Sequence, residues 1–402
     1  MGVLAITGGS KTYTENIAMP WPVSDKRDLD GLLGVMGQNV QGKNGPIAEK
    51  FEKRFAEYNQ VKHCILCANG TTAIELILRG LGIGYGDEVI MPPYTFIASG
   101  SAIIYAGVTP VFADIEPDTC SLSAESVRTK ITPKTKAIMP VFVGGRPSDM
   151  DALTKLAEET GLYLICDAAQ AVGAEWRGKS IGSYGIAASY SCQNTKNLNC
   201  GEGGAITTND DALAAEIRTI LNGGMAQDGS YTHIGSNHNI SEWQASMLNT
   251  QMDSLDEQTA LRMENAAYLD SLLEPIPCVS PLKSDERITK NAYHLYIIRI
   301  HEEHLKGVSR NRFLDAVYAE GIGLYRGYMP LYDFPCMFGQ YATNAVGSKI
   351  DISPLSVCEQ SSRRETSWLL QSVFLNSKTA IKAIADAIKK VYENIDELKE
   401  EA

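Results

Sequence analysis

The sequence predicts an α/β protein with a mostly parallel central sheet, followed by a smaller C-terminal α+β domain. From about residue 60 to residue 210, short apolar runs alternate with segments whose apolar residues recur at helical spacing, and Gly or Pro stands at the joints. Such alternation is typical of βα units whose sheet is covered by helices on both faces. A second observation is the helical pattern of residues 241–273, which is longer than a crossover helix needs.

The first part of the chain contains the apolar runs that we interpret as strands. They are residues 63–68, 88–91, 110–115, 137–143, 162–166, 187–192 and 204–208. Between them, residues 72–81, 96–106, 124–130 and 148–160 have helical periodicity. In open α/β sheets ligands bind outside the carboxyl ends of the strands, so the residues that follow each run are the first candidates for a site.

The second part begins with residues 241–273, which we interpret as a connector between two domains. We expect a strand at residues 291–300, a helix at 311–320 and a terminal amphipathic helix at 378–398. No internal repeat or low-complexity linker separates the two parts, which favours close packing. We therefore predict a large domain over residues 1–250, including an N-terminal segment 1–30, and a small domain over residues 251–402.

Composition excludes several classes of protein. With 402 residues, of which 44% are hydrophobic and 21% charged, the chain can form two domains with cores and should not be disordered. Its net charge of −12 argues against nonspecific binding to nucleic acid or to an anionic membrane. No apolar run approaches the roughly 18 to 20 residues of a membrane span, and no basic region precedes an apolar stretch at the amino terminus. These features predict a cytoplasmic protein.

The nine cysteines stand mostly inside apolar runs, which is typical of buried free thiols in a reducing compartment. Cys64 and Cys67 form a C-x-x-C pair, for which a metal or redox role is an alternative. No second pair at ligand spacing supports zinc, and the segment has the pattern of a buried strand. We therefore expect no metal site.

The most informative residue is Lys196, in a polar, glycine-rich loop between two apolar runs. A lysine on a loop is usually a solvated surface charge. Here Gly201-Glu-Gly-Gly204 supplies a flexible backbone that can approach a bulky cofactor. Partial burial near other cationic groups would lower the pKa of the amine, which must be neutral to form a Schiff base with an aldehyde. Lys196 is therefore a candidate catalytic residue.

Asp167 directly follows the apolar run at residues 162–166, so it should project from the carboxyl end of a strand. Taken alone, it could be a metal ligand or a helix cap. Together with Lys196 it is typical of a pyridoxal 5′-phosphate enzyme, in which a carboxylate keeps the pyridine nitrogen protonated. Gln170 is then placed to reach the phenolic oxygen or the ring face of that cofactor.

Two further segments are candidates for cofactor binding. The motif Asn69-Gly70-Thr71-Thr72 stands between a strand and a helix, where free amides, the helix dipole and two hydroxyls suit a phosphate. The alternative is a plain helix cap, which Thr71 would serve equally well. The motif lacks the lysine of a Walker loop and the glycine pattern of a dinucleotide site. Phe96 follows the next strand and could stack on a planar cofactor or pack in the core.

In this order, these residues resemble the DegT/DnrJ/StrS family of sugar and cyclitol aminotransferases, which have the aspartate aminotransferase fold (fold type I). The similarity extends across nearly the whole chain. The motifs that carry it are Asn44-Gly-Pro46, Phe51-Glu52, Gly82-Ile-Gly-Tyr-Gly-Asp-Glu-Val89, Thr109-Pro-Val-Phe-Ala-Asp-Ile115, Asp167-Ala-Ala-Gln-Ala-Val-Gly-Ala174, Gly235-Ser-Asn237 and Ser241-Glu-Trp-Gln-Ala245.

The resemblance implies roles for particular residues. Lys196 would bind the aldehyde of the cofactor covalently, Asp167 would bind the pyridine nitrogen, and Ser191 and Thr71 would hold the phosphate. Asn237 would reach the phosphate of the neighbouring subunit's cofactor, because the active sites of this family are built across a dimer interface. The resemblance therefore also implies a homodimer with shared active sites.

The activity implied is transfer of an amino group from glutamate or glutamine to a keto sugar, possibly nucleotide-linked, or to a keto cyclitol. Such reactions belong to amino-sugar, aminocyclitol and antibiotic biosynthesis. The variant Gln193-Asn-Thr-Lys196 is similar to the branch with scyllo-inosose aminotransferases and amino-hydroxybenzoate synthases. Two alternatives remain: a dehydratase or aromatase of the amino-hydroxybenzoate synthase type, and a noncatalytic regulator with the same fold.

Two segments depart from the family pattern, and both are expected toward the substrate. The family usually carries a histidine where this chain has Phe142, and it often carries a His-Tyr-x-Pro-Leu-His segment where this chain has Gly327-Tyr-Met-Pro-Leu-Tyr332. No individual sugar is therefore carried over to this chain. Lys196 itself is retained, which disfavours the 3-dehydratase relatives that have histidine at that position.

Overall fold

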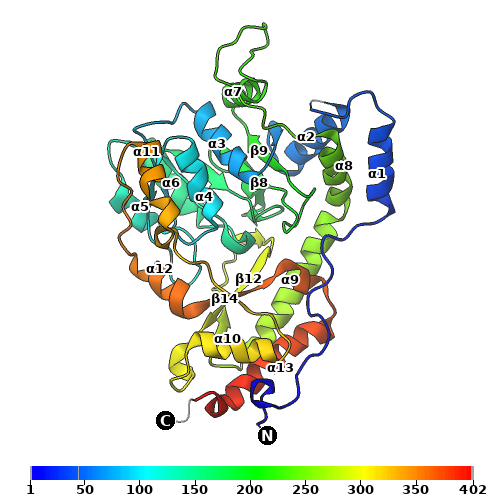
Figure 1. Ribbon diagram of the computed structural model, residues 1–402, viewed down its shortest axis with the longest axis vertical. Helices are drawn as coiled ribbons and strands as arrows, with labels where there is room; N and C mark the ends of the chain where they lie inside the picture. The colour runs from blue at the N-terminus through cyan, green and yellow to red at the C-terminus, as the bar shows by residue number, and fades with distance from the viewer. Residues whose placement is uncertain (1, 44, 400–402) are drawn as a thin grey trace.

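The computed structural model describes residues 2–43 and 45–399 and has an upper and a lower part in the view of Figure 1. Asn44, the first residue of one motif singled out above, lies outside the described residues. Helices α8 (Glu242–Gln251) and α9 (Leu255–Leu273) run from the upper part to the lower part. A single 3₁₀ turn at Met252–Ser254 separates them, so the long helical pattern predicted for residues 241–273 is two consecutive helices.

A seven-stranded sheet in the order β1-β9-β8-β5-β4-β2-β3 forms the centre of the upper part. Only β9 runs against the others, pairing antiparallel with both β1 and β8, whereas the remaining neighbours are parallel. The predicted mostly parallel sheet is thus confirmed. The strands are β1 (His63–Cys67), β2 (Glu88–Met91), β3 (Thr109–Phe112), β4 (Thr135–Ile138), β5 (Tyr163–Asp167), β8 (Ala187–Ser191) and β9 (Gly204–Thr208).

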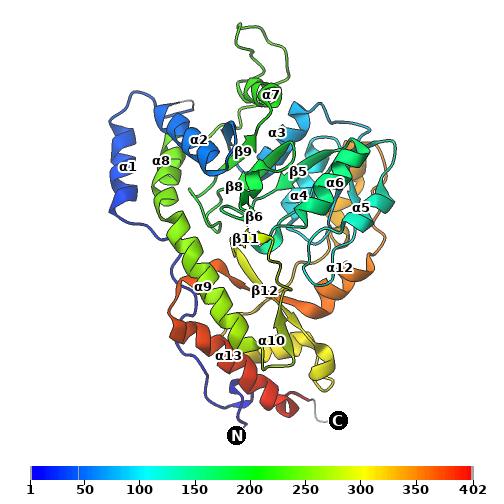
Figure 2. The same ribbon diagram turned by 180° about the vertical axis from the view of Figure 1, so that it is seen from behind.

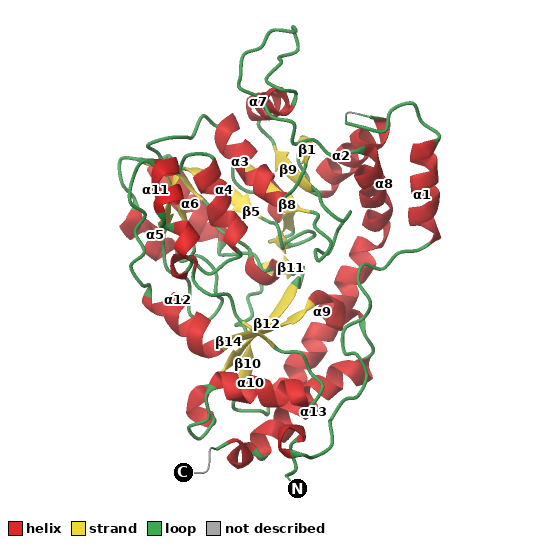
Figure 3. Ribbon diagram, in the orientation of Figure 1, coloured by secondary structure: helices red, strands yellow, loops and turns green. Residues whose placement is uncertain are grey.

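Helices cover both faces of this sheet, as Figure 3 shows. One core lies under α2, α6 and α8, and the other under α3, α4 and α7. Strand β1 shows why both faces must be apolar, because Cys64 and Leu66 pack in the first core while Ile65 and Cys67 pack in the second. The helices of the upper part, besides α8, have these bounds: α2 (Pro46–Tyr58), α3 (Gly70–Gly80), α4 (Ile97–Tyr105), α5 (Ala124–Lys130), α6 (Met150–Thr160) and α7 (Asp211–Leu221).

The same alternation bears on the C-x-x-C pair. Cys64 and Cys67 point to opposite faces of the sheet, so their sulfur atoms face different cores. Burial raises the pKa of both thiols above the ordinary value. The two residues therefore serve as small apolar side chains on the two faces of β1.

Some predicted strands end before their apolar runs do; residues 110–115, for example, were expected as a strand, but β3 ends at Phe112. Residues 137–143 were expected as a strand, but β4 ends at Ile138. Pro140 has no amide hydrogen for a ladder, and Gly144 adopts the left-handed region with φ 72°. The chain after β4 stays beside β5 through a bridge from Val141 to Asp167 and a hydrogen bond from the Phe142 amide to the Asp167 carbonyl.

The lower part is an α+β unit, as predicted. Its sheet has the order β10-β12-β14-β13 and its core includes buried residues of α9, α10 and α13. The strand expected at residues 291–300 begins only at Leu295. The elements are β10 (Val279–Pro281), β12 (Leu295–Ile300), β13 (Tyr325–Arg326), β14 (Thr366–Leu370), α10 (Arg310–Ala319), α12 (Ser356–Gln360) and α13 (Lys378–Glu393).

Two segments cross the predicted division at residues 250 and 251, which itself stays a prediction. Near the amino terminus, Leu4 and Ile17 pack in the lower core, where Glu320 accepts hydrogen bonds from the amides of Ala5 and Thr12. Helix α1 (Lys26–Met36) then lies against α8 in both ribbon views (Figures 1 and 2). In the other direction, α11 (Gln340–Val346) packs on α4 in an upper core.

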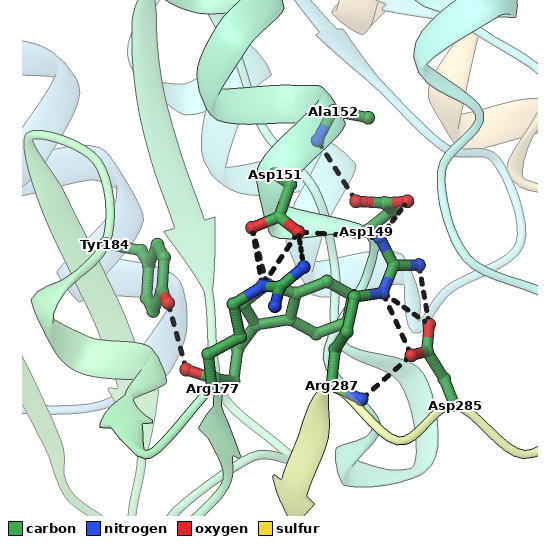
Figure 4. A network of polar contacts seen from close by, with 8 residues as sticks. Asp149, Asp151, Ala152, Arg177, Tyr184, Asp285 and Arg287 are labelled. Atoms are coloured by element: carbon green, nitrogen blue, oxygen red, sulfur yellow. Dashed lines mark hydrogen bonds and ion pairs between the residues drawn. The ribbon is translucent and has the colours of Figure 1, made fainter.

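A network of polar contacts joins residues from the second half of the sequence to residues from the first half (Figure 4). Arg287 pairs with Asp149 at 3.0 Å and with Asp285 at 2.7 Å, and its guanidinium lies 4.5 Å from the centre of the Trp176 ring. Asp149 also caps α6 by accepting from the Ala152 amide. Trp176 belongs to a three-stranded sheet formed by β6 (Glu175–Trp176), β7 (Lys179–Ser180) and β11 (Ile288–Lys290).

Among the described residues, no helix combines the length and the apolar character that crossing a membrane requires.

Candidate active site

The carboxyl ends of β5 and β8 bring two predicted site residues to one edge of the sheet. These strands are parallel neighbours in which Asp167 pairs with Ser189, so Asp167 and Ser191 end their strands at the same edge. Helix α3 begins beside them, because a Cβ atom added to Gly70 would lie 2.8 Å from the Cβ of Ser191. Only glycine allows this approach.

The first turn of α3 provides amide donors next to the Ser191 hydroxyl. Asn69 caps the helix, since its side chain accepts from the amide of Thr72 at 2.9 Å. Asn69 therefore performs the capping role that the sequence allowed for Thr71. Among the described residues, the amides of Gly70 and Thr71 and the hydroxyl of Thr71 have no hydrogen-bond partner. This arrangement suits an anion at the helix amino terminus.

Asp167 is almost fully buried and its two carboxylate oxygens are held in place. The Ser99 hydroxyl donates to Oδ2 at 2.7 Å, and the Ala169 amide donates to Oδ1 at 3.1 Å. Burial raises the pKa of Asp167 above its ordinary value, although these two hydrogen bonds and the charge of Lys196 oppose the shift. The carboxylate is thus positioned to accept a hydrogen bond from a cationic partner.

Lys196 lies in the loop between β8 and β9, close enough to Asp167 for their charges to interact. The loop is closed by hydrogen bonds from the Asn194 amide to the Gly201 carbonyl and from the Lys196 amide to the Gln193 carbonyl, both at 2.8 Å. Partial burial lowers the pKa of the Lys196 amine to about 8, and the opposite charge of Asp167 limits that fall. A neutral amine is therefore available near neutral pH.

Gln170 is fixed beside this pair by two hydrogen bonds. The Gly144 amide donates to its Oε1 at 2.8 Å, and its Nε2 donates to the hydroxyl of Tyr328 at 3.1 Å. The Tyr328 ring in turn packs against Trp368, with 4.5 Å between ring centres. Burial raises the pKa of Tyr328 to about 12. The predicted role of Gln170 toward a cofactor stays a prediction.

Two predicted residues are exposed in this chain. Phe96 stands at the N-cap of α4 with 55% of its surface accessible, so it does not serve the core-packing alternative. Asn237 lies in the segment after α7, which includes the loop projecting at the top of Figure 1. Its side chain accepts only from Asn239 among the described residues, and no described contact joins it to Lys196 or Asp167. The structure thus brings Asp167, Lys196, Gln170, Ser191 and the first turn of α3 to one edge of the sheet, and no described contact joins Phe96 or Asn237 to them.

Phe142 and Tyr332, which stand where the family carries histidine, both have buried side chains. Phe142 is fully buried in the core under α6, and Tyr332 is buried with its hydroxyl donating to Glu359 at 2.8 Å. The expectation that both side chains lie toward a substrate finds no support in their burial.

Sequence reasoning did not find Ser99 or His294. Ser99 is one of two serines on a mostly apolar helix, and that contrast was the available signal. His294 is a buried histidine in a run of apolar and aromatic residues, and its partner lies far away in the sequence.

Known proteins are similar to this chain over most of its length. The model of the DegT/DnrJ/EryC1/StrS aminotransferase family matches residues 23–351. The L-glutamine:2-deoxy-scyllo-inosose aminotransferase of Streptomyces paromomycinus is 36% identical over 418 residues, covering 96% of this chain and 97% of the relative. The GDP-perosamine synthase of Caulobacter vibrioides is 36% identical over 329 residues, covering 79% of this chain and 86% of the relative.

A solved structure is also similar to this chain over nearly its whole length. The crystal structure of a 3-amino-5-hydroxybenzoic acid synthase superposes with a TM-score of 0.83 and 31% identity. The superposition covers 94% of this chain and 99% of the other.

Proposed function

Because the chain belongs to the DegT/DnrJ/EryC1/StrS aminotransferase family, we propose that it transfers an amino group from glutamate or glutamine to the ketone of a cyclitol or a sugar. The chain is a pyridoxal phosphate-dependent aminotransferase. The observation that carries the proposal is the meeting of Asp167 and Lys196 at one sheet edge, where the carboxylate is buried and the amine has a lowered pKa.

The acceptor class is supported by the relatives. A relative similar over nearly the whole chain is named for a deoxy-scyllo-inosose acceptor and an L-glutamine donor. The relative named for GDP-perosamine supports a nucleotide-linked sugar as the other candidate class. We therefore place the enzyme in aminocyclitol or amino-sugar biosynthesis.

The residues at the sheet edge fit pyridoxal phosphate. Asp167 would accept a hydrogen bond from the protonated ring nitrogen, and Lys196 would bind the aldehyde. The phosphate would lie at the amino terminus of α3, against the free amides of Gly70 and Thr71 and the hydroxyl of Ser191. Thr72 is the next residue in this first turn of α3. These groups meet the three separate demands of the cofactor: a cationic ring nitrogen, an aldehyde and a dianion.

Gln170 and Phe96 would complete the cofactor site. Gln170 is immobilised by Gly144 and Tyr328, so it can present a fixed face to the ring or its phenolic oxygen. Phe96, exposed at the start of α4, would stack on the ring.

When bound, pyridoxal phosphate withdraws electrons from the carbon that carries the transferred nitrogen. The chain's own contribution is to hold and move protons. Asp167, buried and hydrogen-bonded by Ser99, stabilises positive charge on the ring nitrogen. Lys196, with a pKa of about 8, is neutral in roughly a tenth of molecules at pH 7 and can accept the proton from the α-carbon of the donor. The donor leaves as its keto acid, and the ketone receives the nitrogen in the second half of the cycle.

The test uses enzyme carrying pyridoxamine phosphate, mixed with a panel of keto cyclitols and nucleotide-linked keto sugars. We expect the spectrum of the lysine-bound aldehyde to return with one acceptor class, and mass spectrometry to find nitrogen in that product. Loss of water without gain of nitrogen would instead support the dehydratase or aromatase alternative. Absence of any response to either donor or acceptor would contradict the proposal and favour the noncatalytic regulator.

We also propose a homodimer in which Asn237 completes the partner's phosphate site. The segment that carries it also exposes Tyr231 and Ile234, with 76% and 91% of their surfaces accessible in the single chain. Such apolar exposure on the segment that carries Asn237 is typical of a surface that a second copy covers.

Mixing two inactive variants tests this arrangement. Asn237→Asp would place a negative charge beside the partner's phosphate, and Lys196→Ala removes the amine of its own subunit. Randomly mixed hybrids have one intact site, so about a quarter of wild-type activity should return, as half of the dimers are hybrids. The control pair, Lys196→Ala with Asp167→Asn, combines two defects of one subunit's own site and should also regain activity if the lysine and aspartate came from different subunits. We expect it to stay inactive, and recovery there would contradict the assigned subunit division.

The proposal that the enzyme works in a reducing compartment such as the cytoplasm is supported by its cysteines. All nine are free thiols, and only Cys336 is exposed.

A further inference from the structure

The loop that carries Lys196 is held at two points. One is formed by Ala292 and His294, which precede β12 of the lower part, and the other by Trp21 of the N-terminal segment. The amide Nδ2 of Asn197 donates to the carbonyl of Ala292 at 2.7 Å, and its Oδ1 lies 3.3 Å from Nδ1 of His294. Earlier in the loop, the carbonyl of Asn194 accepts from Nε1 of Trp21 at 2.9 Å. Both Asn197 and His294 are buried, so the two contacts of Asn197 are sheltered from competing water.

The donor in the contact between His294 and Asn197 follows from the other bond of the amide. The NH₂ group of Asn197 must face the Ala292 carbonyl, which can only accept, so the amide oxygen faces the imidazole. Burial, together with the positive charges of Lys196 and Arg262, holds the pKa of His294 well below its usual range. The ring is therefore neutral, and Nδ1 carries the hydrogen that Asn197 accepts.

A second set of contacts supports His294 from behind. The backbone amide of Gln371 donates to the carbonyl of His294 at 3.1 Å. The side-chain Oε1 of Gln371 accepts from Nε and Nη2 of Arg262 at 3.0 and 2.6 Å. The guanidinium of Arg262 lies 5.3 Å from the centre of the Trp21 ring. Because Trp21 also donates to the carbonyl of Asn194, these contacts form a closed series that begins and ends at the lysine loop.

We propose that His294 is a positioning residue for Lys196: by holding Asn197 against the lower domain, it keeps the amine at residue 196 buried beside Asp167. The neighbour of Asn197 in the chain is Lys196 itself, so a shift of one moves the other. Without the hydrogen bond from His294, Asn197 keeps only its bond to the Ala292 carbonyl, so the loop loses one of two fixed contacts at the residue next to the lysine. This inference rests on the proposed role of Lys196.

The test measures the ionisation of Lys196 in the cofactor-free protein. A small amine-reactive reagent is applied over a range of pH, and labelling of the peptide that contains Lys196 is quantified by mass spectrometry. In the wild-type protein we expect a midpoint near pH 8. His294→Leu fills the space but donates no hydrogen bond, so the midpoint should move up by about one pH unit or more toward that of a solvated lysine.

Three further variants separate positioning from general damage. His294→Asn, whose amide can place a donor near the position of Nδ1, should restore most of the midpoint shift. Asn197→Ala breaks the same contact from the other side and should reproduce the shift, and it carries the test if His294→Leu does not fold. His301→Leu is the matched control, because His301 contacts Ser280 in the same domain but not the lysine loop, and it should keep the wild-type midpoint.

The outcomes distinguish the two proposals. A wild-type midpoint in both His294→Leu and Asn197→Ala would overturn the positioning role. Separately, borohydride is added to wild-type protein with pyridoxal phosphate. If the cofactor is then trapped on a residue other than Lys196, the proposed function fails, whatever the midpoints show.

Discussion

Replacing Lys196 by alanine should abolish multiple turnovers, with a loss of at least about 10³-fold in the rate of amino transfer. The reason is that the half-buried amine, with its pKa near 8, is the group placed beside Asp167 to accept and return the substrate proton. The absorbance of the lysine-bound aldehyde should also disappear when pyridoxal phosphate is added. Both effects are measured on one sample, by absorbance titration and by a coupled assay for the keto acid.

Two comparisons make this result specific. Lys155→Ala removes an exposed lysine of α6 and should change neither the spectrum nor the rate. Ethylamine added to the Lys196→Ala protein should restore part of the rate, because the deletion leaves space where a small amine can accept the proton. Retention of multiple turnovers by Lys196→Ala without added amine would refute the assignment.

Replacing Asp167 by asparagine should lower the rate by about 10²- to 10⁴-fold, the equivalent of the 3 to 5 kcal/mol lost when one partner of a buried ion pair is removed. Asparagine keeps the shape of the side chain but offers no negative charge to the ring nitrogen. Steady-state kinetics at saturating cofactor measure the loss. Ser99→Ala removes one hydrogen bond to Oδ2 and leaves the charge, so it should cost much less, about tenfold.

The labelling midpoint of Lys196 in the Asp167→Asn variant distinguishes the effect of the carboxylate's charge from the effect of its shape. The carboxylate of Asp167 raises the pKa of Lys196, against the lowering by burial. In the cofactor-free protein, Asp167→Asn should therefore move the labelling midpoint of Lys196 below about 8, whereas Ser99→Ala, which retains the charge, should leave it nearly unchanged. An unchanged midpoint in Asp167→Asn would mean that the two side chains do not interact.

The elements that follow a local pattern were predictable to within a few residues. Strands β2 and β9 and helix α5 have the predicted bounds, because their apolar spacing and flanking breakers are complete within a few positions. Helix α3 begins at Gly70, two residues before the predicted start, because Asn69 and not Thr71 provides the cap. The termination of β4 was missed, since it depends on how the chain passes β5.

The core of the candidate site was also accessible from the chain alone. Asp167 and Lys196 each stand at the end of, or just after, an apolar run, and parallel strands bring such ends to one edge. What the pattern could not supply is the support of those residues. Ser99 reaches Asp167 across 68 positions, and His294 reaches Asn197 across 97. No local periodicity encodes contacts of that range.

The sequence by itself determined the fold class and the family and indicated the two residues that we propose for the centre of the chemistry, because alternating apolar runs and residue types at strand ends are local properties. Only the tertiary structure decided that β9 runs antiparallel, that the N-terminal segment packs in the lower core, and that Trp21 and His294 hold the lysine loop. These features depend on which distant surfaces bury one another, and that choice is made by the whole packed chain.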